Sequence, residues 1–174
     1  MLVVIDAQPG FLGEAAEAVV ERIVWLVAVA RRLCIPVLVT EEEPDVHGAT
    51  DERIASQLPT GAAAFRKPTF GLAATPEILA AVRETGRRVA VIVGAETDVC
   101  VAQSAIGLQD AGFTCVVVED AAFSPGELHE RGLVRAGEAG VSRNHTKGVT
   151  YEWLRTVDDA HALSADESMP ARPY

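Results

Sequence analysis

The sequence predicts an α/β fold, a three-layer doubly wound sandwich with a mainly parallel sheet. Short runs of apolar, β-branched residues alternate along the chain with longer runs of strong helix formers, a pattern typical of βαβ units. The segment 2–5, LVVI, is entirely apolar, as a strand is when helices cover both faces of its sheet. A length of 174 residues with 49% hydrophobic residues suits one globular domain.

The first half of the chain contains the predicted elements up to residue 67. Residues 2–5 form the first strand, which stops at Asp6. A helix over 14–33 is predicted because strong helix formers continue almost to Pro36, which a helix cannot easily enter. The elements that follow are a strand over 36–40, a loop over 41–50, a short helix over 51–57 and a brief strand over 64–67.

The clearest helix of the second half covers 76–85. Pro76 occupies its first helical position and Gly86 follows its last turn. The remaining elements are a strand over 88–93, a helix over 98–111, a strand over 113–118, a helix over 127–139, a strand-like segment near Gly140 and a short helix over 149–155. We therefore expect one domain over 1–156 and a loosely held tail over 157–174, which mixes acids, Ser, Pro and Ala.

The charge pattern argues against several classes of partner. Acidic residues outnumber basic ones by 25 to 15, which gives a net charge of -10, and no basic block occurs. Nucleic acid and anionic membranes are therefore poor partners. The longest apolar run, 23–30, is far shorter than the roughly 20 residues that a membrane-spanning helix needs.

The cysteines indicate a reducing compartment. Cys34, Cys100 and Cys115 form an odd set, and the amino-terminal sequence MLVVIDAQ is typical of a strand rather than of a basic signal peptide. We therefore expect the protein in the cytoplasm. Cys34 and Cys115 lie within apolar runs, so we expect them to be small buried hydrophobic residues.

The carboxyl ends of the strands are where a doubly wound sheet binds its ligands. The groups predicted there are Asp6, Thr40, Lys67, the segment 94–100 and Asp120. Cys100 falls in the first turn of the helix predicted over 98–111, where the helix dipole favours a thiolate, so its position suits a nucleophile. Asp120 is expected only to cap the turn after its strand.

Lys67 and Asp6 are the candidates for assisting Cys100. Lys67 is one of only two lysines, with Lys147, and it lies where a lysine can hold a thiolate or a carboxylate by charge. Asp6 ends an apolar strand, so a partly desolvated carboxylate there could act as general base toward a thiol. The residues alone leave open a solvated Lys67 and an Asp6 that only forms a turn.

Four segments together resemble the isochorismatase-like cysteine hydrolases, a family that includes nicotinamidases and carbamoylsarcosine amidohydrolases. The segments are VVIDAQPGF at 3–11, FRKPTFG at 65–71, VIVGAETDVCV at 91–101 and VVVEDA at 116–121. The resemblance covers nearly the whole chain to about residue 155. The order Asp, Lys, Cys is specific as a set, although each segment is weak alone.

The resemblance implies a catalytic triad of Asp6 as general base and acid, Lys67 as electrostatic partner and Cys100 as nucleophile. Attack of Cys100 on a carbonyl carbon would form a thioester and release ammonia or an amine, and water would then hydrolyse the thioester. The resemblance also implies a cis peptide bond between Ala95 and Glu96, which aims the N–H groups of Glu96 and Cys100 at the oxyanion. The residues expected around a small substrate pocket are Gln8, Phe11, Phe70 and Thr97.

A metal site of the nicotinamidase type is incomplete in this sequence. Nicotinamidases carry an Asp-x-His pair and a further histidine as metal ligands. Asp45 and His47 match the pair, but Arg53 occupies the position of the third ligand. The loop TEEEPDVHGAT resembles a metal-free branch of the family, which also has a glutamate where this chain has Glu96. We therefore expect no metal and no cofactor.

Other functions are less well supported by the same residues. A phosphate-handling domain would need a second acid beside Asp6 or a GxxxxGK loop, and the chain has neither. Vinyl-ether cleavage, as in the isochorismatase branch, and a non-catalytic binding role both stay open. The apolar breadth of the helix over 14–33, which includes Trp25, indicates a homo-oligomer. The prediction favoured is a cysteine hydrolase acting on the C–N bond of a small amide.

Overall fold

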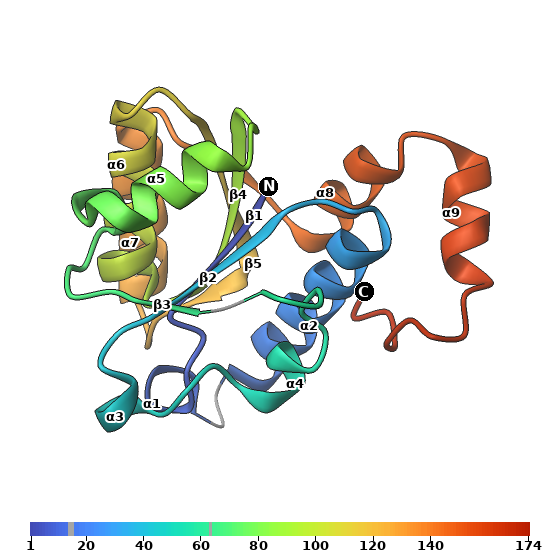
Figure 1. Cartoon of the computed structure of the whole chain (residues 1–174), viewed down its shortest axis with the longest axis horizontal. Coiled ribbons are helices and arrows are strands. Elements are labelled where there is room, and N and C mark those ends of the chain that lie inside the picture. The colour runs from blue at the N-terminus through green and yellow to red at the C-terminus, as the bar shows by residue number, and fades with distance from the viewer. Residues whose placement is uncertain (14–15, 63) are drawn as a thin grey trace.

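The sheet at the centre of the molecule has six strands, all parallel, in the order β3-β2-β1-β4-β5-β6 (Figure 1). The computed structural model describes residues 1–13, 16–62 and 64–174. Its strands are β1 (Leu2–Ile5), β2 (Val37–Glu41), β3 (Ala64–Arg66), β4 (Val89–Ala95), β5 (Thr114–Phe123) and β6 (Ser142–Asn144). This arrangement confirms the predicted doubly wound α/β fold.

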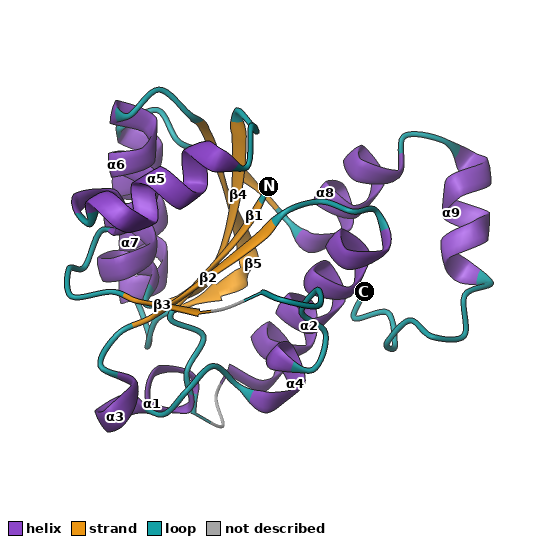
Figure 2. Ribbon diagram, in the orientation of Figure 1, coloured by secondary structure: helices purple, strands orange, loops and turns teal. Residues whose placement is uncertain are grey.

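Helices cover both faces of the sheet (Figure 2). One face carries α5 (Pro76–Glu84), α6 (Ala102–Asp110) and α7 (Leu128–Glu138), and the other carries α2 (Glu17–Arg32) and α8 (Thr146–Leu154). Alternate residues of β1 enter the two cores. Leu2 and Val4 pack on the side of α2, whereas Val3 and Ile5 pack on the side of α5. This two-sided burial explains why β1 is apolar at every position.

Shorter elements complete the chain. They are α1 (Pro9–Leu12), α3 (Pro44–His47), α4 (Glu52–Ala55), the 3-10 turn η2 (Leu72–Ala74), the π-helical turn η3 (Thr97–Val101) and α9 (Val157–Ser164). The helix predicted over 98–111 is therefore divided, since η3 carries Cys100 and α6 follows it. Residues 14 and 15 of the helix predicted over 14–33 lie outside the described residues. None of the described helices is both long and apolar enough to cross a membrane.

Strand β5 continues past the end predicted at residue 118, because ion pairs neutralise two acids within it. Glu119 pairs with Arg143 at 2.9 Å. Asp120 pairs with Arg22 at 3.2 Å. Asp120 Oδ1 also accepts hydrogen bonds from the N–H and the hydroxyl of Thr146. Asp120 therefore satisfies the first turn of α8, and the expectation that it caps the turn after its own strand is wrong.

The apolar breadth of α2 is covered within the chain. Trp25 Nε1 donates a hydrogen bond to the Thr150 hydroxyl at 3.0 Å, and the guanidinium of Arg172 lies 5.6 Å from the centre of the Trp25 ring. Leu163 of α9 is buried in the same core. The segment 157–174 thus contributes side chains to the core, where a loosely held tail was expected, and α2 needs no partner subunit to cover Trp25.

Two glycines allow the backbone to approach closely around the strand ends. A Cβ on Gly94 would lie 1.9 Å from the carbonyl oxygen of Ile5, and the Gly94 φ of 121° lies in the region that favours glycine. A Cβ on Gly132 of α7 would lie 2.6 Å from the Cα of Asp98. Gly132 therefore lets α7 pack directly against η3, the turn that carries Cys100.

Gly132→Ala should destabilise the protein by about 3 kcal/mol, because the added methyl group overlaps the backbone of η3. Urea unfolding followed by circular dichroism measures the change. Gly137→Ala is the matched control on the same helix. An added Cβ there meets no described atom within 4 Å outside its own helix, so it should stabilise the protein by about 0.5–1 kcal/mol. Equal effects of the two substitutions would contradict the close packing of α7 on η3.

Candidate active site

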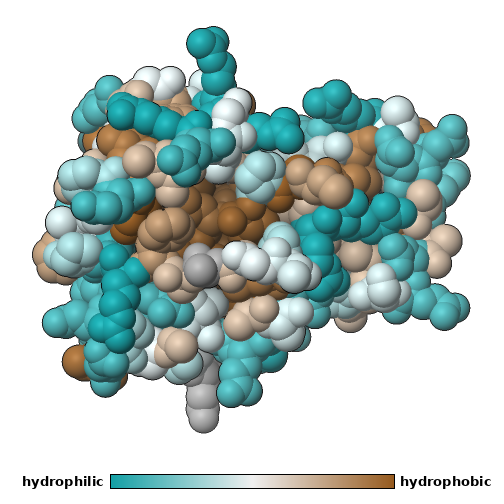
Figure 3. All heavy atoms as spheres, viewed as in Figure 1, coloured by the Kyte–Doolittle hydropathy of each residue, from teal (hydrophilic) through white to brown (hydrophobic). Residues whose placement is uncertain are grey.

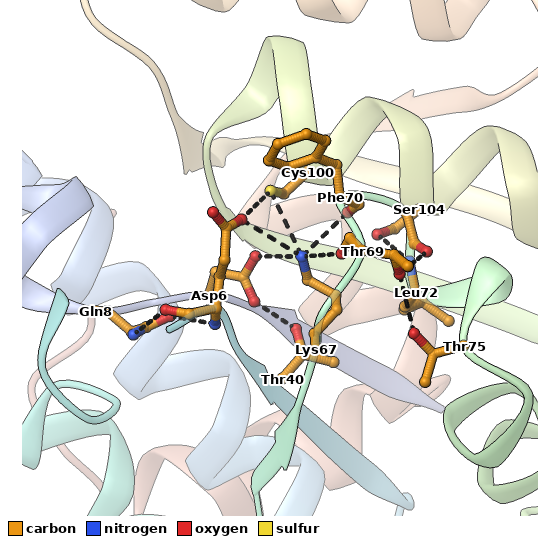
Figure 4. A network of polar contacts seen from close by, with 12 residues as sticks. Asp6, Gln8, Thr40, Lys67, Thr69, Phe70, Leu72, Thr75, Cys100 and Ser104 are labelled. Carbon is orange, nitrogen blue, oxygen red and sulfur yellow. Dashed lines mark hydrogen bonds and ion pairs between the residues drawn. The ribbon is translucent and has the colours of Figure 1, made fainter. Parts of the chain in front are cut away.

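The carboxyl ends of β1, β2 and β3 and the turn η3 converge at one edge of the sheet. They bring together the side chains of Asp6, Glu42, Lys67 and Cys100, which lie far apart in the sequence. Figure 4 shows the Lys67 ammonium between the side chains of Asp6 and Cys100. The three residues of the predicted triad are therefore in contact through Lys67.

Asp6 and Lys67 form a fully buried ion pair. Lys67 Nζ lies 2.9 Å from Asp6 Oδ2, and neither side chain is exposed to solvent. The Thr40 hydroxyl donates a hydrogen bond to Asp6 Oδ1 at 2.8 Å. Burial raises the pKa of the Asp6 carboxyl, and the Lys67 charge opposes this rise. The attraction between the two charges therefore offsets the free-energy cost of removing each of them from water.

The backbone also holds Lys67 in place. Its ammonium donates hydrogen bonds to the carbonyl oxygens of Thr69 at 2.7 Å and Phe70 at 3.1 Å. The same nitrogen lies 3.6 Å from Cys100 Sγ and 3.6 Å from Glu42 Oε2. The alternative of a solvated surface lysine is therefore wrong.

Cys100 is buried, and its thiol donates a hydrogen bond to Glu42 Oε2 at 3.1 Å. Burial, the negative charge of Asp6 and the bond to Glu42 raise the pKa of the Cys100 thiol, and Lys67 offsets them only in part. The expectation that a helix dipole favours the thiolate is therefore not met in the resting site. Two carboxylates and one ammonium surround the sulfur, and a π-helical turn replaces the regular first turn of a helix.

Glu42 is the residue of this cluster that the sequence did not single out. It follows β2 directly, as Asp6 follows β1, but it stands in the acidic run 41–43, which is typical of a solvated loop. The Gln8 side chain binds both the N–H and the carbonyl group of Glu42. Gln8 Oε1 accepts a hydrogen bond from the Glu42 N–H at 2.8 Å, and Gln8 Nε2 donates one to the Glu42 carbonyl at 3.0 Å. The available signal was an acidic run that begins directly after the strand predicted over 36–40, and it does not single out Glu42.

A cavity of about 580 Å³ opens at two of the clustered residues, Glu42 and Lys67. It lies between the loops that follow β2 and β3, and its lining residues are Glu42, Glu43, Pro44, Arg66, Lys67, Pro68, Thr69 and Phe70. Phe70 is 55% exposed, and Figure 4 shows its ring beside Cys100. Phe70 therefore lines this cavity, and its contact with a substrate stays a prediction.

The other three residues predicted around the pocket make different contacts. Gln8 is fully buried, and its side-chain amide forms hydrogen bonds with the backbone of the loop after β2. Phe11 packs against His47, with ring centroids 4.3 Å apart. The Thr97 hydroxyl lies 2.9 Å from Nδ1 of His129. These three residues are near the triad in sequence, but they are not among the residues that line the cavity.

Two backbone features define the segment between β4 and Cys100, a cis peptide bond and a π-helical turn. The peptide bond between Ala95 and Glu96 is cis, as the resemblance implies. The Glu96 carbonyl accepts a hydrogen bond from the N–H of Val101 at 3.0 Å, which starts the π-helical turn. Burial, followed by the charges of Asp98 and Glu42, raises the pKa of the Glu96 carboxyl. Glu96 therefore adds a third carboxyl group near the site.

Asp45 and His47, the residues matched to a metal-binding pair, are engaged separately. Arg66 donates two hydrogen bonds to Asp45, at 2.7 and 3.1 Å, and holds the pKa of the Asp45 carboxyl below its usual range. Within the part of the chain that the structure describes, the possible ligands gathered around His47 are Glu42 and Glu43. The nicotinamidase-type pair is therefore not assembled here.

The sequence matches the family model of the isochorismatase domain over residues 1–142. The chain belongs to the isochorismatase family. Isochorismatase domain-containing protein 1 of Danio rerio is 38% identical over 96 residues, which are 55% of this chain and 33% of that protein. Isochorismatase domain-containing protein 2 of Rattus norvegicus is 29% identical over 138 residues, which are 78% of this chain and 62% of that protein. The matches thus span less than two thirds of each of these relatives.

Solved structures share the fold of this isochorismatase-family chain. MAR1 ribonuclease from Caenorhabditis elegans has a TM-score of 0.86 at 22% identity, covering 98% of this chain and 91% of its own. The YcaC gene product of Escherichia coli, described as an octameric hydrolase of unknown specificity, has a TM-score of 0.84 at 23% identity, covering 93% of this chain and 84% of its own. The chain therefore has the fold of isochorismatase-like hydrolases.

Lys67→Met should lower the free energy of unfolding by about 3–5 kcal/mol, because it leaves the buried Asp6 carboxyl without its partner. The loss should be larger at pH 8 than at pH 5. Without Lys67 the native Asp6 holds its proton to a higher pH than the unfolded chain does, so stability falls as the pH rises through that window. Urea unfolding at both pH values measures the effect.

Lys147→Met is the matched control for this substitution, since Lys147 is the other lysine of the chain and is exposed. It should change the free energy of unfolding by less than about 0.5 kcal/mol at either pH. A Lys67→Met protein as stable as the control would mean that the ion pair contributes nothing to the fold.

Proposed function

We propose that this isochorismatase-family protein is a cysteine-dependent hydrolase that cleaves the C–N bond of a small amide. The observation that carries the proposal is the contact of the Cys100 thiol with the buried pair of Lys67 and Asp6 beside an open cavity. A thiol, an ammonium group and carboxylates in this arrangement are the groups that a thioester mechanism needs.

In the proposed reaction the Cys100 thiol gives its proton to a carboxylate, and Sγ attacks the carbonyl carbon of the amide. Lys67, 3.6 Å from Sγ, stabilises the thiolate as it forms. The N–H groups of Glu96 and Cys100 bind the oxyanion of the tetrahedral intermediate. Cleavage of the C–N bond releases ammonia or an amine and leaves a thioester, which water hydrolyses.

Asp6 is the general base that the family resemblance implies. Its raised pKa suits a carboxyl group that binds a proton closer to neutral pH than a solvated aspartate does. Its contact with Lys67 also keeps the ammonium beside the sulfur. In this proposal Asp6 and Lys67 act as a unit, and replacing either removes the charge balance around Cys100.

The cavity supports a small-molecule substrate, and the proposed reaction uses no cofactor. YcaC from Pseudomonas aeruginosa, of the same fold with a TM-score of 0.82 and 23% identity, was solved with covalent acrylamide. Acrylamide forms covalent bonds with nucleophiles through its alkene, so this adduct supports a reactive nucleophile in that neighbour. The net charge of -10 gives no support to an RNA substrate.

We also propose that the chain forms a homo-oligomer in the cytoplasm. The Escherichia coli YcaC neighbour is described as octameric. Figure 3 shows apolar side chains gathered in the middle of one face of the molecule, with polar side chains around them, as at many subunit interfaces. Cys34 is exposed and free, so the expectation that it is buried is wrong. An exposed free thiol supports a reducing compartment.

Cys100→Ser should reduce amide turnover to below about 1% of wild type, since a hydroxyl replaces the nucleophilic sulfur at nearly the same size. A panel of small primary amides assayed for ammonia release measures the loss. Cys34→Ser removes an exposed thiol instead and should keep wild-type turnover. A Cys100→Ser protein with more than a few percent of wild-type activity would contradict the assignment of Cys100 as the nucleophile.

Exhaustive treatment with EDTA should leave amide turnover unchanged, because no step of the proposed reaction passes through a metal. The same panel of amides measures the activity before and after chelation. Loss of turnover on chelation, followed by recovery with zinc or iron, would instead make His47 and its acidic neighbours metal ligands.

A further inference from the structure

A single segment, residues 124–135, anchors the start of the turn η3, which carries Cys100. The Ser124 hydroxyl donates a hydrogen bond to Asp98 Oδ1 at 2.6 Å and accepts one from the Asp98 N–H at 3.3 Å. Gly132 packs directly against the backbone of the same residue. The residues of this segment are not among those that line the cavity. The turn is therefore held by contacts that lie outside the space for a substrate.

His129, at the start of α7, binds the first residue of η3. Its Nδ1 lies 2.9 Å from the Thr97 hydroxyl. Thr97 is buried, with 1% of its surface exposed, so the bond with His129 satisfies a hydroxyl group that solvent does not reach. Removing the imidazole takes this partner away from the hydroxyl, and a buried polar group without a partner costs free energy.

The surroundings of His129 favour its neutral form. Burial lowers the pKa of the imidazole and the charge of Arg143 lowers it further, while the charges of Glu130 and Glu119 oppose the shift. A neutral imidazole has one unprotonated nitrogen, which can accept the hydrogen of a hydroxyl group. The contact with Thr97 therefore suits a neutral ring with Nδ1 as the acceptor.

Thr97 directly follows Glu96, whose N–H is one of the two proposed oxyanion donors. On its other side Glu96 continues from β4, which ends at Ala95. The Glu96 carbonyl accepts hydrogen bonds from the N–H groups of Val99 at 3.2 Å and Val101 at 3.0 Å. Because Thr97 is bonded directly to Glu96, a shift of Thr97 also moves the Glu96 N–H.

We propose that His129 is a positioning residue, which holds Thr97 in place so that the Glu96 N–H stays aimed at the oxyanion. The inference rests on the proposed function, because it concerns the same thioester reaction. His129 is not among the residues that line the cavity, so it acts through Thr97 and not on the substrate. Its loss should slow formation of the tetrahedral intermediate and leave the Cys100 thiol as it is.

The first test measures acetylation of Cys100 by p-nitrophenyl acetate, a reaction that passes through an oxyanion. In His129→Leu the rate constant of the p-nitrophenolate burst should fall about 10- to 100-fold, because a displaced N–H binds the oxyanion poorly. The amplitude of the burst, which counts competent sites, should stay that of wild type. A role in folding alone would lower the amplitude and leave the rate constant unchanged, which would overturn the proposal.

Alkylation of Cys100 by iodoacetamide is the matched reaction without an oxyanion, because the sulfur displaces iodide at a saturated carbon. The alkylation rate of His129→Leu should stay within about twofold of wild type, since this reaction depends on the thiolate alone. Mass spectrometry of the modified peptide measures the rate. An equal fall in alkylation and acetylation would mean that His129 supports the whole site, and the proposal would be overturned.

His129→Asn is the conservative variant, because the amide of asparagine reaches the place of Nδ1 whereas that of glutamine reaches the place of Nε2. The burst rate of His129→Asn should return to within about threefold of wild type, and His129→Gln should stay slow. His161→Leu, at an exposed histidine of α9, is the matched control and should react like wild type. Equally slow bursts in the Asn and Leu variants would contradict a role for the bond with Thr97.

A double-mutant cycle tests whether His129 acts through Thr97. Thr97→Val removes the hydroxyl and keeps the shape of the side chain. In the Thr97→Val background, His129→Leu should change the burst rate by less than about twofold, because the bond is already lost. Losses that add in the double variant would show that His129 acts by another route and would overturn the proposal.

The outcomes separate this inference from the proposed function. If wild-type Cys100 is never acetylated by p-nitrophenyl acetate, the nucleophile assignment fails and the role of His129 fails with it. If wild-type Cys100 is acetylated and His129→Leu is acetylated at the same rate, the proposed nucleophile stands and the role of His129 is overturned.

Discussion

The buried ion pair of Lys67 and Asp6 is the interaction on which the rest of the site depends. Burying an ammonium group in a protein interior costs much free energy unless an opposite charge and hydrogen-bond acceptors surround it. Here β1 supplies the carboxylate and the turn after β3 supplies two carbonyl oxygens. Once Lys67 is fixed, the loop after β2 and the turn η3 bring Glu42 and Cys100 to the same nitrogen. Charge compensation thus sets the geometry of the site.

Most of the fold and part of the site could be predicted from sequence, for local physical reasons. A strand buried on both faces has to be apolar, so β1 and β4 are evident as runs, and their ends point to Asp6 and Cys100. The family resemblance and the scarcity of lysine add Lys67. Strand β5 was predicted too short because Glu119 and Asp120 become compatible with a strand only after arginines from other elements neutralise them.

The remaining features of the site depend on contacts between distant segments. Nothing in the run of three glutamates 41–43 distinguishes the middle one until Gln8, 34 residues away in sequence, binds its backbone. Thr97 stands in the segment that carries Cys100, but α7 offers its hydroxyl a partner in His129. The raised pKa of the Cys100 thiol was missed for a similar reason. A helix dipole is visible in sequence, whereas a surplus of carboxylates around one sulfur arises only in the folded chain.

The raised pKa of the buried Cys100 thiol also bears on how this protein reacts with oxidants. Peroxides react with thiolates far faster than with thiols, and they need access to the sulfur. The fold disfavours the thiolate, since burial and the neighbouring carboxylates raise the pKa of the Cys100 thiol. Cys34, at the surface, lacks this shielding. In the proposed reaction Cys100 loses its proton only while a substrate is attacked, so a resting site of this kind slows sulfenic acid formation.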